Sequence, residues 1–302
     1  MRPLNNIEVL EVMPDKRVMP LENLYLSQRL HNVAENLGRS IVYANYLCDL
    51  NEVIAVKGQD GFFRVPEALR NHDDWRLFQE LEAQADVIIT SKVYLGRFAA
   101  EGEDAQNVLT EFEAGSEFED LGEWRLQNGF KWRRPDLAIV GRRPDLVIPR
   151  SAIQPGRNIL FFTTYDLSNS DDAKRLKDMG VTVVGAGAEG VEGKVMIDYL
   201  ATRRNYRTIY AVSGPSIVKI LLDAQVLNRL YVTQVNRKIL FDDPSSVKRI
   251  LSNGKRVSRI PGFVLTKRYL QDKVVTEDQT LTAQEFLLYE NFGKRLVQND
   301  AL

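Results

Sequence analysis

The chain is poor in the residues that form disulfides and metal sites. Its 302 residues include one cysteine, Cys48, and two histidines. A single cysteine excludes an intramolecular disulfide framework, and two histidines without companion cysteines do not supply the usual ligand set of a structural zinc ion. We therefore expect a fold that is held together by its hydrophobic core, with no bound metal.

Net charge and long apolar runs are missing as well. Lys and Arg together number 40 and Asp and Glu 41, so the formal net charge is −1. This balance removes the general electrostatic reason to expect nucleic acid or an anionic membrane as a partner. No uninterrupted run of about 18 apolar residues occurs, and the first residues mix acids among their apolar positions. We expect a cytoplasmic protein that binds neither membrane nor nucleic acid.

The sequence does contain a regular alternation of short apolar runs and amphipathic stretches. With 44% hydrophobic and 27% charged residues, its composition is that of a globular protein. Helical spacing predicts helices at 73–84, 170–179 and 215–224. Strands interleaved with helices predict an α/β fold with a mixed, mostly parallel central sheet flanked by helices. The strands are predicted from runs rich in Val, Ile, Leu and aromatic residues, at 40–47, 85–90, 137–140, 158–163, 181–184, 208–212 and 229–235.

Two further segments are less regular. Residues 94–131 are acidic and contain glycines, which predicts a long loop that is either a lid over a site or an insertion without catalytic importance. Near the end, LTAQEFLLYENFGKRLV places Leu281, Phe286, Leu287 and Phe292 in a roughly helical distribution. Such an apolar face either completes the core or forms a homodimer contact, and the sequence leaves both open.

The stretch VTVVGAGAEG at 181–190 has the glycine spacing of a dinucleotide-binding fingerprint. A fingerprint also needs a helix that starts within the glycines and an acid about 20 residues further on, at the end of the next strand. Here the helical pattern starts near Val195, and the next strand, TIYAV, carries no acid. We therefore predict a glycine-rich loop between a strand and a helix, and keep a Rossmann dehydrogenase as an alternative.

The next strand leads into a second candidate phosphate site, in TIYAVSGPSIVKILLDA. Gly214 permits close backbone approach, and Pro215 suits the first position of a helix, where its missing N–H costs nothing. The helix that follows presents free amides and a partial positive charge to an anion. An equally weighted alternative is a strand-to-helix turn with Ser213 as the helix N-cap.

Five blocks of sequence, between about residues 40 and 238, decide between these alternatives. They are IVYANYLCDLNEVIAV, LEAQADVIITSKVY, RPDLAIVGRRPDLVIP, FFTTYD, and VSGPS followed by VLNRLYVTQV. In order and spacing they resemble the reductase family typified by the C-terminal domain of bacterial RibD. These pyrimidine reductases of riboflavin synthesis share the dihydrofolate-reductase fold.

The resemblance implies a domain division and a reaction. A dihydrofolate-reductase-like domain is expected at 39–270, with an N-terminal extension at 1–38 packed on it and a C-terminal extension at 271–302. The implied reaction is hydride transfer from NADPH to an imine or carbonyl carbon of a pyrimidine or related nucleotide-like substrate. The cofactor carries that chemistry, and the protein must hold it against the acceptor carbon and exclude water.

The resemblance also assigns residues. Asp49 and Asn51 are the expected catalytic residues, with Asp49 as the acid that supplies a proton or orients a water, and Asn45 is the expected substrate ligand. A polar loop after the first strand is the alternative for Asp49 and Asn51. The expected contacts to NADPH are Thr90, Ser91, Thr163, Thr164, Gly185, Ser213, Gly214, Pro215 and Ser216.

The chain departs from the family pattern at several of these positions. Where the family has Ser-Leu-Asp-Gly, this chain has Asp49, Leu50, Asn51 and Glu52, so a glutamate replaces the glycine. Val212 replaces the glutamate of the family's Glu-Gly-Gly turn. These changes raise a second hypothesis, a catalytically silent paralogue that uses the fold to bind a nucleotide or a partner.

Overall fold

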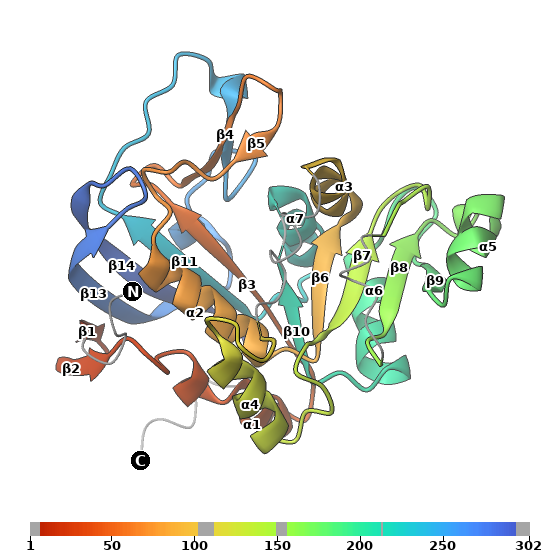
Figure 1. Ribbon diagram of the computed structural model, residues 1–302, viewed down its shortest axis with the longest axis horizontal. Coiled ribbons are helices and arrows are strands. Elements are labelled where there is room, and N and C mark those ends of the chain that lie inside the picture. The colour runs from red at the N-terminus through yellow and green to blue at the C-terminus, as the bar shows by residue number, and fades with distance from the viewer. Residues whose placement is uncertain (1–6, 102–111, 149–155, 213, 294–302) are drawn as a thin grey trace. The chain divides into compact units, whose positions relative to one another are not determined.

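The structure is a computed structural model that describes residues 7–101, 112–148, 156–212 and 214–293 (Figure 1). The chain forms two compact units, each built from separate segments. The first unit comprises Met1–Leu24, Tyr43–Phe78 and Leu227–Leu302, and the second comprises Tyr25–Val42 and Gln79–Val226. Each unit is therefore described by itself.

The first unit contains a mixed sheet in which most neighbouring strands are antiparallel. Strand β11 pairs with β3 in parallel, so the carboxyl ends of these two strands lie at the same edge. The strand order is β2-β1-β13-β14-β11-β3. Its strands are β1 (Glu8–Met13), β2 (Arg17–Pro20), β3 (Ile41–Cys48), β11 (Arg229–Val235), β13 (Val264–Val275) and β14 (Leu281–Glu290).

A second, smaller sheet in this unit follows the carboxyl end of β3. It consists of β12 (Val247–Arg249), β4 (Val53–Lys57) and β5 (Phe63–Arg64), in that order and antiparallel. Strand β4 begins four residues after Asp49, so this small sheet anchors the loop that holds the predicted catalytic residues.

The second unit contains five parallel strands in the order β10-β6-β7-β8-β9. Strands β7 and β8 are buried along their whole length, as expected for a parallel sheet covered on both faces. Figure 1 shows the five strands side by side, with α5 at the β9 edge. They are β6 (Val87–Ser91), β7 (Asp136–Val140), β8 (Ile159–Thr163), β9 (Thr182–Gly185) and β10 (Thr208–Ala211).

Seven α-helices accompany the described strands, and several begin or end where the sequence predicts. The Ser170 hydroxyl accepts a hydrogen bond from the Ala173 amide and caps α5, which Gly180 follows at φ +86°. The helices are α1 (Leu30–Leu37), α2 (His72–Ala83), α3 (Lys92–Glu101), α4 (Glu119–Gln127), α5 (Asp171–Asp178), α6 (Gly193–Asp198) and α7 (Pro215–Asp223). The predicted α/β class with a mixed, mostly parallel sheet is confirmed.

Two predictions from local sequence are wrong. The segment 94–131 is not one loop, since α3 extends to Glu101 and α4 occupies Glu119–Gln127; residues 102–111 lie outside the described part. The segment beginning at Leu281 is strand β14 rather than a helix, because it pairs with both β11 and β13. Pairing with strands distant in sequence overrides a weak local helical pattern.

Described residues of the expected N-terminal extension take part in both units. Strand β1 pairs with β13 in the first unit. In the second unit, the Glu80 carboxylate accepts hydrogen bonds from the amides of Tyr25 and Leu26, and the Gln84 side chain accepts one from Leu30. The division at residues 38 and 270 stays a prediction, and the second of these positions lies within β13.

Candidate active site

Most of the predicted cofactor residues lie at one edge of the second unit. Because β6, β8, β9 and β10 are parallel, their carboxyl ends meet at the same edge, which is where open α/β sheets bind ligands. Ser213 lies outside the described residues. The others at this edge are Thr90 and Ser91 on β6, Thr163 at the end of β8, Thr164 after it, Gly185 on β9, and Gly214, Pro215 and Ser216 after β10.

Hydrogen bonds within the protein already engage some of these side chains. The Ser91 hydroxyl accepts a hydrogen bond from the Tyr94 amide at 3.2 Å and so caps the start of α3. The Thr163 hydroxyl donates to the Arg142 carbonyl, which ties the loop after β7 to the end of β8. The Thr90 hydroxyl is buried and has no hydrogen-bond partner among the described residues.

The turn before α7 has the open form that an anion site requires. Gly214 is the N-cap residue and Pro215 the first helical residue, so the alternative in which Ser213 is the N-cap is corrected. A Cβ atom at Gly214 would meet nothing within 4 Å, so the side of this residue that a side chain would occupy is open. This turn can hold phosphate with backbone N–H groups.

A pocket of about 410 Å³ lies beside these loops in the second unit. It is lined by Arg142, Arg143, Thr164, Asp166, Leu167 and Ala188. The predicted Thr164 is in this wall, and Ala188 belongs to the GAGAEG loop. The two arginines follow β7 and were not among the predicted cofactor residues.

In the first unit, the carboxylate of Asp49 organises its own loop. One oxygen accepts hydrogen bonds from the amides of Asn51 and Val53, each at 2.8 Å. The other oxygen accepts from the Ile239 amide at 2.9 Å. Asp49 is fully buried, and these three backbone donors favour the polar-loop alternative for it over the role of proton donor.

The neighbouring predicted residues lie in the same part of the first unit. The carbonyl of Asn51 accepts a hydrogen bond from Arg249. Asn45 is half-buried in β3, opposite Tyr231 of β11, and shares a strand face with Leu47. The catalytic role of Asn51 and the substrate-binding role of Asn45 stay predictions.

Glu52, which replaces the family's glycine, keeps a backbone conformation typical of glycine. Its φ is +60°, and its carboxylate accepts hydrogen bonds from the Val257 amide at 3.1 and 3.2 Å. Burial raises the pKa of Glu52, although the Val257 amide and the Arg256 charge oppose the rise. The side chain thus compensates for the left-handed strain by fixing the loop to a distant segment.

Asp74 is a buried carboxyl group of the first unit that the sequence patterns do not single out. Asp74 lies in the first turn of α2, where Asn71 accepts a hydrogen bond from its amide at 2.9 Å. Burial raises the pKa of Asp74 to about 6; a hydrogen bond from the Thr233 hydroxyl lowers it, and the charge of Asp73 raises it. A carboxyl group that titrates near neutrality can hold and release a proton.

Asp49 follows strand β3, and Asp74 is hydrogen-bonded to a residue of β11, the parallel neighbour of β3. Thr233 of β11, the partner of Asp74, lies in register with Leu47 of β3, two residues before Asp49. The Gln234 side chain donates to the Asp49 carbonyl at 3.5 Å. The first unit therefore presents a buried carboxyl group with a raised pKa near the loop that the sequence identifies.

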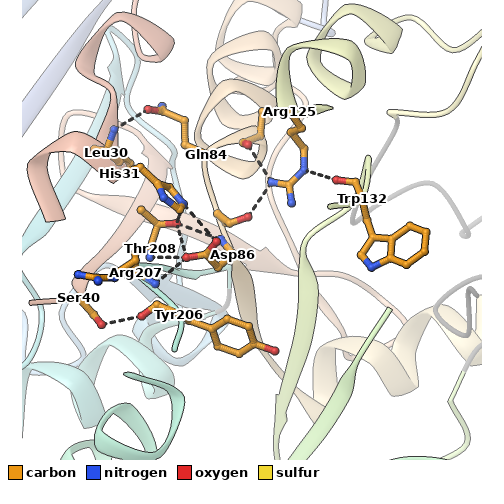
Figure 2. A network of polar contacts seen from close by, with 12 residues as sticks. Leu30, His31, Ser40, Gln84, Asp86, Arg125, Trp132, Tyr206, Arg207 and Thr208 are labelled. Atoms are coloured by element: carbon orange, nitrogen blue, oxygen red, sulfur yellow. Dashed lines mark hydrogen bonds and ion pairs between the residues drawn. The ribbon is translucent and has the colours of Figure 1, made fainter. Parts of the chain in front are cut away.

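Asp86, in the second of the five sequence blocks, has a structural role (Figure 2). The Asp86 carboxylate accepts hydrogen bonds from the amides of Arg207 and Thr208, at 2.6 and 2.9 Å, and pairs with His31 at 3.1 Å. Burial raises the pKa of Asp86, but His31 and these amides outweigh it, and the net pKa is below the usual value. The carboxylate thus joins the starts of β6 and β10.

We expect Asp86→Ala to lower the free energy of unfolding by about 2–4 kcal/mol, because two amides lose a charged acceptor. Since the folded-state pKa is depressed, the stabilisation by Asp86 is present above the unfolded-state pKa and is lost as the pH falls. Urea denaturation at about pH 7 and about pH 3, which lies below the unfolded-state pKa, measures both effects. Asp86→Asn keeps one acceptor oxygen and should give a smaller loss, and equal stability of all three proteins would contradict this role.

Neither a protein-family model nor a curated protein matches the chain. Solved structures do match. RibD of Acinetobacter baumannii aligns with a TM-score of 0.55 and 13% identity, over 85% of this chain and 59% of its own. A pyrimidine reductase-like protein of Corynebacterium diphtheriae aligns with a TM-score of 0.53 and 19% identity, over 86% of this chain and 98% of its own.

A third structure, the riboflavin biosynthesis reductase of Saccharomyces cerevisiae, aligns with a TM-score of 0.50 and 13% identity, over 89% and 98% of the two chains. This chain has the fold of the RibD-type pyrimidine reductases. The resemblance stated from the five sequence blocks is confirmed at the level of the fold. The chain spans 59% of the length of RibD, so the activities of that whole protein do not transfer with the fold.

Proposed function

We propose that the chain is an NADPH-dependent reductase of the pyrimidine-reductase type, which transfers a hydride to an imine or carbonyl carbon. The observation that carries the proposal is the buried Asp74 carboxyl, with its pKa of about 6, in a fold shared with reductases. Reduction of a C=N or C=O bond needs a proton as well as a hydride. Asp74 is the described group best suited to supply it.

The chain's residues fit a phosphorylated dinucleotide. The open turn of Gly214, Pro215 and Ser216 would hold its pyrophosphate, and the loops after β6, β8 and β9 would contact the rest. NADPH, when bound, supplies the hydride. Thr90 is a further candidate contact, because its buried hydroxyl has no hydrogen-bond partner among the described residues.

The proposed proton donor and the proposed substrate contacts are residues of the first unit. Asp74 holds the proton at a carboxyl oxygen, and the Thr233 hydroxyl orients that carboxyl by hydrogen bonding. Asp49 holds the loop of Asn51 in place through three backbone amides, so it acts as a positioning residue in this proposal. Asn45 and Asn51 are the proposed polar contacts to substrate.

The proposed substrate is a pyrimidine or related nucleotide-like molecule. One structural neighbour, from Thermotoga maritima, is described as a 5-amino-6-(5-phosphoribosylamino)uracil reductase, at 11% identity and a TM-score of 0.51. That ribosylaminouracil is the first substrate to test. No described helix is long and apolar enough to cross a membrane. A cytoplasmic location and a homodimer stay predictions.

A cofactor titration tests the proposal. With NADPH at about millimolar concentration, the melting temperature should rise by several degrees, and by more than with NADH, because ligand that binds only the folded state stabilises it. Addition of the ribosylaminouracil should then consume NADPH. No thermal shift with either dinucleotide would overturn the reductase proposal.

The second candidate function is a catalytically silent paralogue that binds a nucleotide or a partner. It is favoured by the loop at 49–52. There, backbone amides donate hydrogen bonds to both oxygens of the Asp49 carboxylate, and Glu52 stands at the family's glycine position. This candidate predicts that NADPH stabilises the protein but that its absorbance stays constant with every pyrimidine substrate. The same titration therefore separates the two functions.

A further inference from the structure

Three buried amide side chains form a continuous chain of hydrogen bonds in the first unit. They belong to Asn71, directly before α2, to Gln271 of β13 and to Gln284 of β14, which are 6%, 3% and 1% exposed. Gln271 and Gln284 lie opposite each other in the β13–β14 pair, and Gln284 Nε2 donates to Gln271 Oε1 at 2.8 Å. Gln284 and Asn71 exchange two hydrogen bonds, at 2.9 and 3.2 Å. The amide chain therefore runs from the β13–β14 pair to the first turn of α2.

Backbone groups at its two ends fix the direction of the amide chain. Asn71 Nδ2 donates to the Leu69 carbonyl at 3.0 Å, and Asn71 Oδ1 accepts from the Asp74 amide at 2.9 Å. A carbonyl only accepts and a backbone N–H only donates, so the two ends of the Asn71 side chain cannot be exchanged. At the other end, Gln271 Nε2 donates to the Lys273 carbonyl at 3.3 Å, which fixes the Gln271 amide in the same way.

The amide chain ends on a carboxylate oxygen of Asp73. Gln271 Nε2 donates its other hydrogen to Asp73 Oδ2 at 2.5 Å, so this oxygen is an acceptor and carries no proton in the bond. Asp73 Oδ1 lies 4.0 Å from Nδ1 of His72, a half-exposed side chain of the same helix. Nitrogen donors of this kind stabilise an ionised carboxylate. The surroundings of Asp73, which is 9% exposed, therefore suit an anion.

The next residue, Asp74, has the opposite surroundings. Burial and the charge of Asp73 both oppose its ionisation. The Thr233 hydroxyl can donate to a carboxylate or accept from a protonated carboxyl, so it fits both states of Asp74. The other titratable group that interacts with Asp74 is the Cys48 thiol of β3, whose own pKa burial raises, so the thiol is neutral at pH 7. Of the two neighbouring acids, Asp74 is thus the one that binds a proton first.

We propose that Gln271 and Gln284 are positioning residues that hold Asp73 as the anion of this carboxyl pair, and that Asp73 in turn keeps on Asp74 the proton that is transferred to substrate. The inference rests on the proposed function, in which Asp74 is the proton donor, and deepens it by naming what keeps the donor protonated. Once Asp74 has lost its proton, two neighbouring anions repel each other, which favours the return of a proton from solvent to Asp74.

Carbon-13 NMR of the full chain, labelled at its aspartate carboxyl groups, measures the titration of Asp74, and Asp74→Asn identifies the signal. Asp73→Asn removes the charge but keeps an oxygen that accepts from Gln271. Gln271→Met has a similar length and cannot donate. The matched control is Asp272→Asn, which removes one carboxylate at an exposed position next to Gln271. Far-UV circular dichroism checks that each variant is folded.

The wild-type protein should show a pKa of about 6 for Asp74. In Asp73→Asn this pKa should fall by about one pH unit, because the repulsion is gone. Gln271→Met should also lower it, since Asp73 without its donor competes for the proton. The control should leave it unchanged, because solvent screens an exposed charge. An unchanged pKa of Asp74 in Asp73→Asn would overturn the inference.

A second break in the amide chain tests the part of the glutamines independently. Gln284→Met removes the link between Asn71 and Gln271 and should lower the pKa of Asp74 in the same direction as Gln271→Met, by a smaller amount, because Gln271 still donates to Asp73. If the pKa of Asp74 is the same in the wild type and in both methionine variants, the amide chain does not position Asp73.

The rate of substrate reduction separates the inference from the proposed function. In Asp73→Asn the fall of the rate with pH should move to lower pH, by as much as the pKa measured by NMR. A lower pKa of Asp74 in a protein that reduces no substrate would support the carboxyl pair and count against the reductase. A lower pKa with an unchanged pH profile of the rate would exclude Asp74 as the donor and overturn the use of the pair in the reaction.

Discussion

Asp74→Asn should lower the rate of substrate reduction by about 10²- to 10⁴-fold, the usual contribution of a positioned proton donor. The amide has nearly the same shape and keeps an acceptor for the Thr233 hydroxyl, so the fold should remain intact. The rate of the wild-type enzyme should fall as the pH rises above about 6, the pKa of Asp74, because only the protonated carboxyl donates. The variant should lack this pH dependence.

The same substitution should stabilise the protein at alkaline pH. The folded-state pKa of Asp74 is raised from 3.8 to about 6, so its contribution is fully present below the unfolded-state pKa and is lost as the pH rises through 6. A shift of this size corresponds to about 3 kcal/mol. Urea denaturation at about pH 8 should therefore show Asp74→Asn to be the more stable protein, with the advantage lost near pH 4.

Thr233→Val provides the matched control for these experiments. It removes the hydroxyl that lowers the pKa of Asp74, so this pKa should rise further. The fall of the reduction rate with pH should then occur at a higher pH than in the wild type. Activity should persist, because the carboxyl remains. If the pH profile is the same in the wild type and in Thr233→Val, Asp74 is not the proton donor. Full activity of Asp74→Asn would exclude Asp74 as well.

The arrangement of the predicted cofactor residues follows from the strand pattern. Seven apolar runs predicted seven strands, and all seven are present as β3 and β6–β11. Alternation with helices predicted parallel pairing, and parallel pairing brings carboxyl ends together. For that reason Ser91, Thr163 and Gly185, which are far apart in the chain, lie at one edge of the second unit.

Asp74 could not be recognised in the same way. In the sequence, His72, Asp73 and Asp74 are typical of the polar first turn of a surface helix. Both aspartates are buried because strands distant in sequence cover them: Gln271 of β13 donates to Asp73, and Thr233 of β11 bonds Asp74. Neither contact leaves a local signal in the sequence, so the burial of these acids follows only from the fold.

Asp49 is the opposite case, a carboxyl group that the sequence does single out. A polar residue at the end of a strand, in a block that resembles a catalytic motif, is a reasonable candidate for an acid. The structure shows that its oxygens accept from Asn51, Val53 and Ile239. The first two donors are local and typical of an aspartate turn, but the third comes from 190 residues away along the chain. Pattern alone does not distinguish a carboxylate that reacts from one that holds a loop.

The GAGAEG loop allows a direct test against the Rossmann alternative, with alanine substitutions at two of its glycines. Gly187→Ala should lower the free energy of unfolding by about 3 kcal/mol or more. Gly187 has φ +149°, and its added Cβ would lie 2.0 Å from the Gly190 carbonyl oxygen, so the backbone itself must move. Thermal denaturation of the purified variant measures the loss.

Gly190→Ala is the control, because a Cβ at Gly190 meets nothing within 4 Å and its φ is not positive. We expect its stability within about 0.5 kcal/mol of the wild type and unchanged NADPH binding. A dinucleotide fingerprint makes the reverse prediction, since its third glycine is needed for close packing of the helix on the strand. Here α6 begins only at Gly193, beyond all three motif glycines, so no helix terminus faces a phosphate from within the motif. Loss of NADPH binding in Gly190→Ala would therefore revive the Rossmann alternative.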